Sequence, residues 1–130
     1  MAWKVQWAKR CERKVTSLTE LDALLDDLHT KHQGDRAVLV TVESPESGDS
    51  LAIGVGRDLS VLNYVPGTGD PPYFTSLGNE SAKGTIVFHF MGQWSEFSMR
   101  NAIPFDQARK AVRFFFETGK LSDKVKWEED

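Results

Sequence analysis

The chain opens with an alternation of apolar and polar residues. Trp3, Val5 and Trp7 alternate with Lys4 and Gln6, and this two-residue period is typical of a strand with one buried face. Both tryptophans then lie on the face opposite Lys4, so we expect the core to bury them. Burial explains these aromatics better than a surface that stacks single-stranded nucleic acid.

A helical period replaces this alternation after residue 17. Ser17 and Glu20 have the spacing of a capping box, in which a hydroxyl and a carboxylate satisfy free N–H groups at a helix start. Five leucines then recur at 3.6-residue spacing opposite an acidic arc, and Gly34 supplies a left-handed stop. The pattern predicts a helix that packs through these leucines, with a protonated His29 or His32 complementing the dipole at its end. The leucines are Leu18, Leu21, Leu24, Leu25 and Leu28.

Residues 37–98 return to strand-like runs, separated by turns rich in Gly, Pro, Asn, Asp and Ser. The connectors Arg57-Asp58 and Gly92-Gln93 are tight enough to force neighbouring strands to pair antiparallel, and short connectors favour a meander. The predicted strands are Ala37 to Glu43, Leu51 to Arg57, Leu59 to Val65, Tyr73 to Leu77, Thr85 to Met91 and Trp94 to Ser98.

A second helix is predicted from Pro104, whose missing N–H costs nothing at a helix start, to Gly119. Phe114 falls on the far side of its apolar stripe, so it either packs under the C-terminal tail or is exposed. The stripe contains Phe105, Ala108, Ala111, Val112, Phe115 and Phe116.

The C-terminal tail alternates once more, which places Val125 and Trp127 against the domain and the acidic side chains of Glu128, Glu129 and Asp130 in water. No repeat or internal linker interrupts the chain. Residues 1–130 therefore read as a single α+β domain, a curved antiparallel sheet of about six to eight strands with two helices packed on it.

Composition then narrows the classes of function. A chain of 130 residues can bury a core without disulfides or a structural metal. A net charge of -3 and a pI of about 5.6 argue against a nucleic-acid partner, because such domains usually have a pI above about 9. No apolar run approaches the roughly 20 residues of a membrane span, so no membrane partner is expected. The single Cys11 favours a reducing compartment, and we predict a cytoplasmic protein.

No constellation of residues predicts a metal or a cofactor. One cysteine and three histidines lack zinc-ligand spacing, and the glycines at 54–56 precede a strand instead of a phosphate-binding helix. His89 is either a hydrogen-bonded histidine inside the sheet or the general base of a small enzyme or ligand-binding domain. The first interpretation is favoured because no nucleophile or carboxylate motif stands beside it. A pocket joining His89 to Glu96 or Tyr64 would favour the second.

The segment from Pro71 to Trp127 carries a more specific pattern. It resembles the first-numbered Imm family of bacterial polymorphic-toxin immunity proteins, which are often found beside deaminase-type toxins. The sequence departs from that family at Ser98 and Ser122, where prolines are usual. The resemblance implies an α+β inhibitor without enzymatic activity that binds one secreted toxin domain and protects the producing cell. The landmarks are Pro71-Pro72-Tyr73, Gly84-Thr85-Ile86-Val87-Phe88, Trp94-Ser95-Glu96-Phe97, Ile103-Pro104, Ala108, Ala111, Phe115, Gly119 and Val125-Lys126-Trp127.

The implied partner is a cognate toxin domain, bound by a chain that we expect to be monomeric. A nucleic-acid deaminase must hold a polyphosphate strand, so an inhibitor that blocks its basic mouth benefits from exposed carboxylates, while buried aromatics supply affinity. The alternative to toxin binding is that each acidic side chain is simply solvated. For Trp94, the alternative is that its ring only covers the end of the Gly92-Gln93 hairpin. The candidate contact residues are Glu43, Glu46, Asp49, Asp70, Tyr73, Phe74, Glu80, Trp94 and Glu96.

Overall fold

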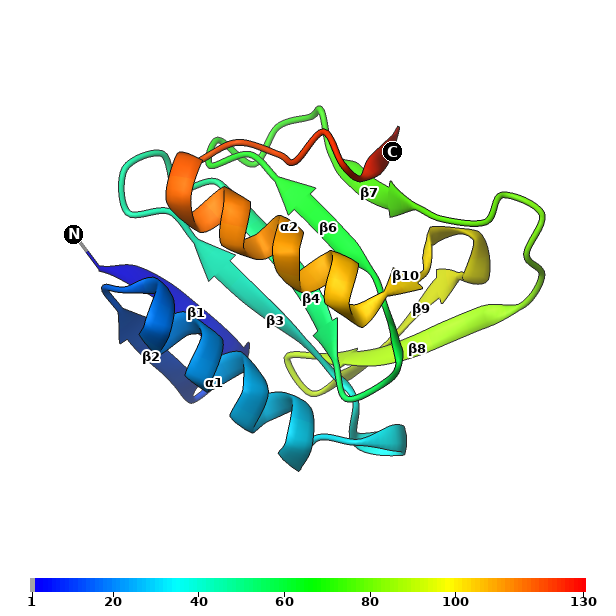
Figure 1. The fold of residues 1–130 in the computed structure, drawn as a ribbon, viewed down its shortest axis with the longest axis horizontal. Coiled ribbons are helices and arrows are strands. Elements are labelled where there is room, and N and C mark those ends of the chain that lie inside the picture. The colour runs from blue at the N-terminus through cyan, green and yellow to red at the C-terminus, as the bar shows by residue number, and fades with distance from the viewer. Residues whose placement is uncertain (1) are drawn as a thin grey trace.

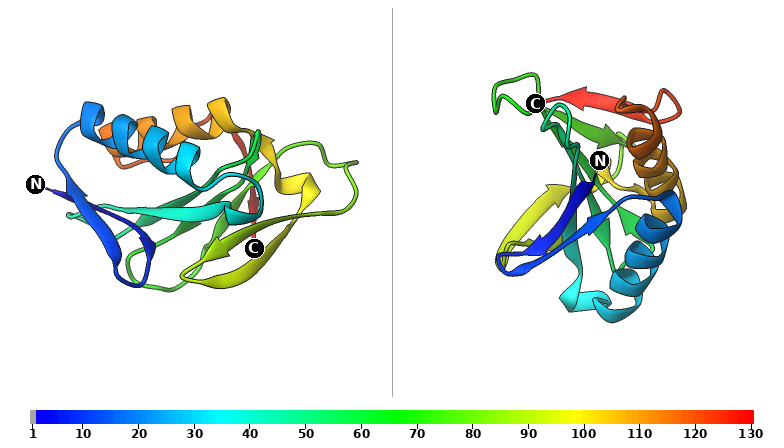
Figure 2. Two further views of the ribbon diagram at one scale, coloured as in Figure 1. Left: turned by 90° about the horizontal axis from the view of Figure 1, so that it is seen from below. Right: turned by 90° about the vertical axis from the view of Figure 1, so that its left-hand side faces the viewer.

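The computed structural model describes residues 2–130 and has an α+β architecture (Figure 1). Helices α1 (Leu18–Lys31) and α2 (Phe105–Thr118) lie side by side on one face of a nine-stranded sheet (Figure 2). The predicted fold class and both helices are therefore confirmed. The strands of the sheet are β1 (Trp3–Ala8), β2 (Cys11–Val15), β3 (Val38–Glu43), β4 (Ser50–Val55), β6 (Leu62–Val65), β7 (Phe74–Leu77), β8 (Thr85–Phe90), β9 (Gln93–Ser98) and β11 (Lys126–Glu129).

The strands follow the order β11-β7-β6-β4-β3-β1-β2, and these neighbours are antiparallel. The predicted meander holds from β3 to β7 and fails after it. Strand β8 crosses to the side of β3 and pairs with it in parallel at Val38 and His89. The antiparallel β8–β9 hairpin is confirmed. We call these two strands and their turn, residues 85–98, the β8–β9 arm.

Two details of the strands differ from the prediction. Strand β2 was missed, because its charged and exposed residues show no apolar alternation. It lies at the end of the sheet, where charged side chains discourage pairing with other chains. The predicted strand Leu59 to Val65 is divided: β5 (Leu59–Ser60) pairs with β10 (Ile103–Pro104), and only β6 joins the sheet.

The helix ends follow local signals with one correction. Ser17 caps α1 by accepting a hydrogen bond from the Glu20 N–H at 3.2 Å, as the capping box predicts. The helix ends at Lys31 with His32 as its cap, and Gly34 belongs instead to the short 3-10 helix η1 (Gly34–Arg36). Neither helix of residues 2–130 has the length and apolar character needed to cross a bilayer.

The sheet buries side chains on both of its faces. On β3, Val38, Val40 and Val42 face the helices, whereas Leu39 faces the β8–β9 arm, because successive side chains point to opposite faces. The helix side holds the larger core, against which Trp3 and Trp7 pack as expected. The arm side holds a second, smaller core formed by Ala37, Leu39, Ala52, Val61, Ile86, Phe88 and Ala102, with Phe97 and Met99 packed against it.

The second core depends on a close approach between β4 and the β8–β9 arm. Phe88 is fully buried, and a Cβ atom added to Gly54 would lie 2.5 Å from its ring. Real Cβ atoms essentially never come so close to another heavy atom. The absence of a side chain at Gly54 therefore sets how tightly the arm closes on the sheet.

His29 fastens the end of α1 to the turn that follows β4. Its Nδ1 atom accepts a hydrogen bond from the Gly56 N–H at 2.8 Å, and its ring stacks on Phe105 with 3.8 Å between centroids. Burial, followed by the charge of Arg109, lowers the pKa of His29 below its ordinary value of 6.5. The predicted role of His29 as a protonated imidazole at the helix end was wrong, because protonated Nδ1 cannot accept this bond.

Replacing Gly54 with alanine should destabilise the fold by about 1–3 kcal/mol, because the new methyl group must displace the Phe88 ring. Urea unfolding monitored by circular dichroism measures the change. The double variant Gly54→Ala/Phe88→Leu should lose less stability than the sum of the two single variants, since the smaller side chain makes room. Strict additivity would show that the two residues are not in this contact.

Stability should also fall as the pH drops through about 6.5. The unfolded chain then binds a proton at His29 that the folded chain, with its lowered pKa, does not bind. Urea unfolding between about pH 7.5 and about pH 5.5 measures this loss, which His29→Asn should reduce because an amide oxygen accepts the Gly56 N–H without titrating. His32→Asn should keep the loss of the unaltered chain, and an equal loss in His29→Asn would contradict the assignment.

Candidate protein-interaction surface

The outer face of the β8–β9 arm presents an exposed tryptophan. Within residues 2–130, Trp94 is the most exposed large apolar side chain, at 66%. Its Nε1 donates a hydrogen bond to Glu96 Oε2 at 3.1 Å, so the predicted placement of these two residues on one strand face is confirmed. The Trp94 ring also meets His89 edge-on, with 6.2 Å between ring centroids. Trp94 thus has a defined orientation although most of its surface faces water.

The register of the hairpin explains this arrangement. His89 pairs with Trp94 and Val87 pairs with Glu96, and residues directly opposite on antiparallel strands share a face. These four side chains form the outer face of the arm, which faces away from the second core. His89 Nε2 lies 3.1 Å from the Asp35 carbonyl oxygen, which agrees with the favoured interpretation of a hydrogen-bonded histidine.

The turn of the hairpin has an unusual backbone. Met91 and Gly92 both have positive φ, 52° and 82°, in a two-residue loop where Asn-Gly is the preferred pair. A left-handed conformation costs a residue such as methionine roughly 1–2 kcal/mol. Phe90, beside this turn, is 40% exposed. The tip of the hairpin therefore combines a strained backbone at Met91 with an exposed apolar side chain at Phe90. Backbone strain of this kind occurs more often at functional sites than elsewhere.

A groove of about 760 Å³ lies beside β8. Arg57 lines it, donating from Nε to the Val87 carbonyl oxygen at 3.0 Å and placing its guanidinium over the Phe88 ring. His89 lines the groove, but neither Glu96 nor Tyr64 does, so the pocket expected of a His89 enzyme is not formed. The lining residues are Asp35, Arg57, Asp58, Leu59, Thr85, Ile86, Val87, His89, Trp94 and Met99.

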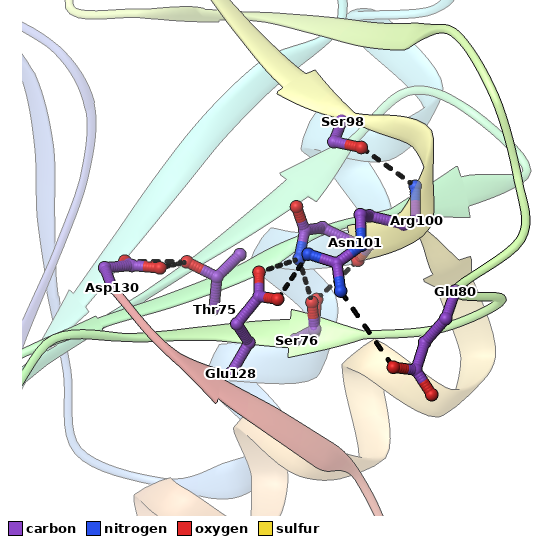
Figure 3. Close-up of polar contacts among 8 residues, drawn as sticks. All are labelled: Thr75, Ser76, Glu80, Ser98, Arg100, Asn101, Glu128 and Asp130. Atoms are coloured by element: carbon purple, nitrogen blue, oxygen red, sulfur yellow. Dashed lines mark hydrogen bonds and ion pairs between the residues drawn. The ribbon is translucent and has the colours of Figure 1, made fainter.

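A polar clamp ties the end of β9 to the C-terminal strand β11 (Figure 3). Arg100 Nη1 forms an ion pair with Glu128 Oε2, and Asn101 Nδ2 donates to Glu128 Oε1 at 3.2 Å. The hydrogen bonds from Asn101 and Arg100 lower the pKa of Glu128. Buried Asn101 also exchanges hydrogen bonds with Ser76 at 2.9 and 2.8 Å. The prediction that Glu128 faces water was wrong, because it is half-buried in this clamp.

The neighbouring turns are stabilised by serine hydroxyls. Ser98 Oγ accepts the Arg100 N–H at 3.3 Å, and Ser122 Oγ accepts the Lys124 N–H at 3.2 Å. At these two positions the resemblance leads us to expect proline. A hydroxyl that bonds the backbone two residues ahead favours a turn by a different route. The departure from the family pattern therefore leaves both turns in place.

Glu80 also joins the clamp, since Arg100 Nη2 lies 3.9 Å from Glu80 Oε1 (Figure 3). Glu80 remains exposed in the connector between β7 and β8. Thr75 Oγ1 makes contacts of 2.9 Å with both carboxylate oxygens of Asp130. The carboxylates of Glu128 and Asp130 therefore stabilise contacts within the chain.

The other predicted contact residues lie at the opposite end of β3. Val38 begins this strand beside the arm and Glu43 ends it, and five residues of extended chain span roughly 17 Å. Glu46 and Asp70 are exposed, and within residues 2–130 neither takes part in an ion pair. The structure thus divides the predicted residues between an arm patch, which contains Trp94, Glu96 and, in the adjoining connector, Glu80, and an acidic loop patch. The second contains Glu43, Glu46, Asp49, Asp70, Tyr73 and Phe74.

Most side chains of the acidic loop patch already have partners within the chain. Glu43 lies 3.8 Å from Lys4 Nζ, and Asp49 Oδ1 accepts the Gly67 N–H at 2.7 Å. Burial, followed by a hydrogen bond with Asp49, raises the pKa of Tyr64. Tyr73 donates its hydroxyl to the Gly69 carbonyl oxygen. Phe74 packs near Tyr64, with 6.2 Å between ring centroids.

Within residues 2–130, the His, Cys, Asp and Glu side chains do not form a metal-binding cluster. Residues 2–130 contain no group of three or more His, Cys, Asp or Glu placed to hold a metal ion. Cys11 is exposed at the start of β2.

Comparison with known proteins extends the resemblance along the chain. The sequence model of a family described as "Immunity protein Imm1" matches residues 9–129. No curated protein matches this chain. The family match includes β2, both helices and the arm, so it covers both patches.

From the contacts of the polar clamp we predict the effect of removing the Asn101 side chain. The variant Asn101→Ala should destabilise the fold by about 1–3 kcal/mol, because the Ser76 carbonyl oxygen and the Glu128 carboxylate each lose the hydrogen bond from the Asn101 side-chain amide. Thermal and urea unfolding measure the loss. Asn79→Ala, in the exposed β7–β8 connector, is the matched control and should change stability by no more than about 0.5 kcal/mol. Equal effects of the two variants would argue against the clamp.

Proposed function

Because the chain belongs to the Imm1 family of immunity proteins, we propose that it neutralises one cognate bacterial toxin by covering the active site of that toxin. Imm1 proteins are toxin inhibitors without enzymatic activity. The family match over residues 9–129 is the observation that carries the proposal. Blocking requires a surface that is held in shape and available to a partner, and the arm supports this role.

Trp94 is the proposed centre of the interface. Tryptophan is enriched among the residues that dominate binding free energy, because it buries a large area at a low entropic cost. Its hydrogen bond to Glu96 and its contact with His89 orient the ring before a partner arrives. Binding then orders fewer side chains, which favours affinity. Glu96 adds a carboxylate beside the ring for a cationic group of the toxin.

The acidic loop patch is proposed to guide the encounter. Glu46 and Asp70 are exposed, whereas Glu43 and Asp49 share their charge with partners in the chain, as Glu80 does outside this patch. Exposed charges mainly raise association rates and select the partner. Tyr73 and Phe74, which are half-buried, would contribute at the rim.

A nucleic-acid deaminase is the class of toxin that we propose. Such an enzyme draws a polyphosphate strand to its active site, and a basic mouth is complementary to exposed carboxylates. The producing cell would need the inhibitor in its cytoplasm, where the nucleic acid is found. One immunity chain for each toxin domain is the proposed stoichiometry.

Co-expression tests the proposed function directly. The toxin domain encoded beside this gene should co-purify with the chain, and cells that make both should survive. A cognate toxin that still kills cells making the chain would refute the proposal. Deaminase activity measured on the isolated toxin domain, with and without the chain, would separate inhibition of the active site from sequestration.

Trp94→Ala should weaken binding of the toxin domain by at least about 30-fold, which corresponds to about 2 kcal/mol. Isothermal titration calorimetry measures the change, and unfolding curves should show that the fold is kept. Phe114→Ala is the matched control, because Phe114 is 40% exposed and lies on α2, away from the arm. Wild-type affinity in Trp94→Ala would move the proposed interface to another surface.

A further inference from the structure

One edge of strand β8 lacks a partner strand along part of its length. Its antiparallel partner β9 follows one edge from Thr85 to Phe90, whereas β3 meets the other edge only at His89. The two-residue turn makes Phe90 and Gln93 a hydrogen-bonded pair, so the backbone groups of Thr85, Val87 and His89 point away from β9. The His89 N–H confirms this direction, since it donates to the Ala37 carbonyl oxygen at 2.8 Å.

A side chain occupies only part of this edge. Arg57 Nε meets the Val87 carbonyl oxygen, as described above. Within residues 2–130, no strand pairs with the Val87 N–H or with the outward backbone groups of Thr85. Thr85 is exposed and Val87 is half-buried, so the rest of the chain does not fully cover either residue.

This edge differs from the edge of β2 at the end of the main sheet. Natural proteins usually block a free edge with charged residues, proline or a covering segment. The sequence of β2 carries Glu12, Arg13 and Lys14, whereas residues 85–88 of β8 are Thr-Ile-Val-Phe. The open part of β8 thus lacks the charges that discourage strand addition.

The groove beside this edge has an acidic character. Asp35 and Asp58 line it, and the single positive side chain of its lining, Arg57, already contacts the Val87 carbonyl and the Phe88 ring. Leu59, which is 39% exposed, supplies an apolar contact on the same wall. Trp94 also lines the groove, and its ring can accept a cation over its face. These charges complement an extended segment that carries a basic residue.

We propose that the open edge of β8 binds an extended segment of the cognate toxin that contains a lysine or arginine, as an added strand in the groove. Backbone hydrogen bonds to Thr85 and Val87 supply affinity, and the acidic wall selects the basic side chain. This inference rests on the proposed function and specifies how the toxin is held. It places the edge of β8 in the same interface as Trp94.

Amide hydrogen exchange followed by NMR tests the added strand. The probe is the full chain labelled with ¹⁵N, alone and in complex with the toxin domain encoded beside its gene. Exchange of the Val87 amide should slow by at least about 10-fold in the complex, because the amide gains a hydrogen bond. Exposed amides of β2 should exchange equally in both states. Protection of Val87 that grows with the concentration of the chain alone would identify a second copy as the occupant and overturn the proposal.

A substitution in the groove provides an independent measurement. Leu59→Lys should weaken toxin binding by at least about 10-fold, because it fills the groove and repels a basic segment. Phe114→Lys is the matched control, since Phe114 has nearly the same exposure, and it should bind normally. Unfolding curves of both variants show that the fold is kept.

The outcomes separate this inference from the proposed function. If the toxin binds Leu59→Lys with full affinity and leaves the Val87 amide unprotected, the added strand is wrong while toxin neutralisation stands. If the unaltered chain does not bind the toxin at all, the proposed function fails and the added strand fails with it.

Discussion

The contact between Gly54 and the Phe88 ring is the constraint on which the second half of the structure depends. Because Gly54 has no side chain, Phe88 can approach β4 until a Cβ atom would be only 2.5 Å away. This approach closes the β8–β9 arm over the face of the sheet that the helices leave free (Figure 2). Once Ile86 and Phe88 face inward, strand alternation turns Trp94 outward. The exposed surface is therefore a consequence of the buried one.

The polar groups of the chain divide between those that hold the fold and those that are free. Arg100, Asn101 and Glu128 hold the end of the arm against β11, and His29 holds α1 against the turn after β4. Charged groups that are already paired within the chain contribute little to the binding of a partner. What remains available is an arm held at its base by the clamp, with an oriented tryptophan, and such preorganisation lowers the entropic cost of binding. This arrangement suits the toxin binding that we propose for this member of the Imm1 family.

Exceptions to local rules gather on this same arm. Trp94 is exposed although it is large and apolar, Met91 adopts a left-handed backbone, and the edge at Thr85 and Val87 lacks both a strand and blocking charges. Each feature alone has a structural cost. Proteins tend to keep such exceptions where function requires them. Their coincidence on one hairpin supports placing the interface there instead of in the acidic loops.

Periodicity by itself determined both helices, most of the strands and the β8–β9 hairpin, because these features follow from backbone preferences over a few residues. It also placed Trp94 and Glu96 on one strand face. Only the tertiary structure decided that β8 joins β3, since no local pattern indicates which distant strand a hairpin will meet. The neutral state of His29 and the partial burial of Glu128 could not be predicted from the sequence either. Both depend on groups remote in sequence, Gly56 in one case and Arg100 in the other, because pairing and burial act through space and not along the chain.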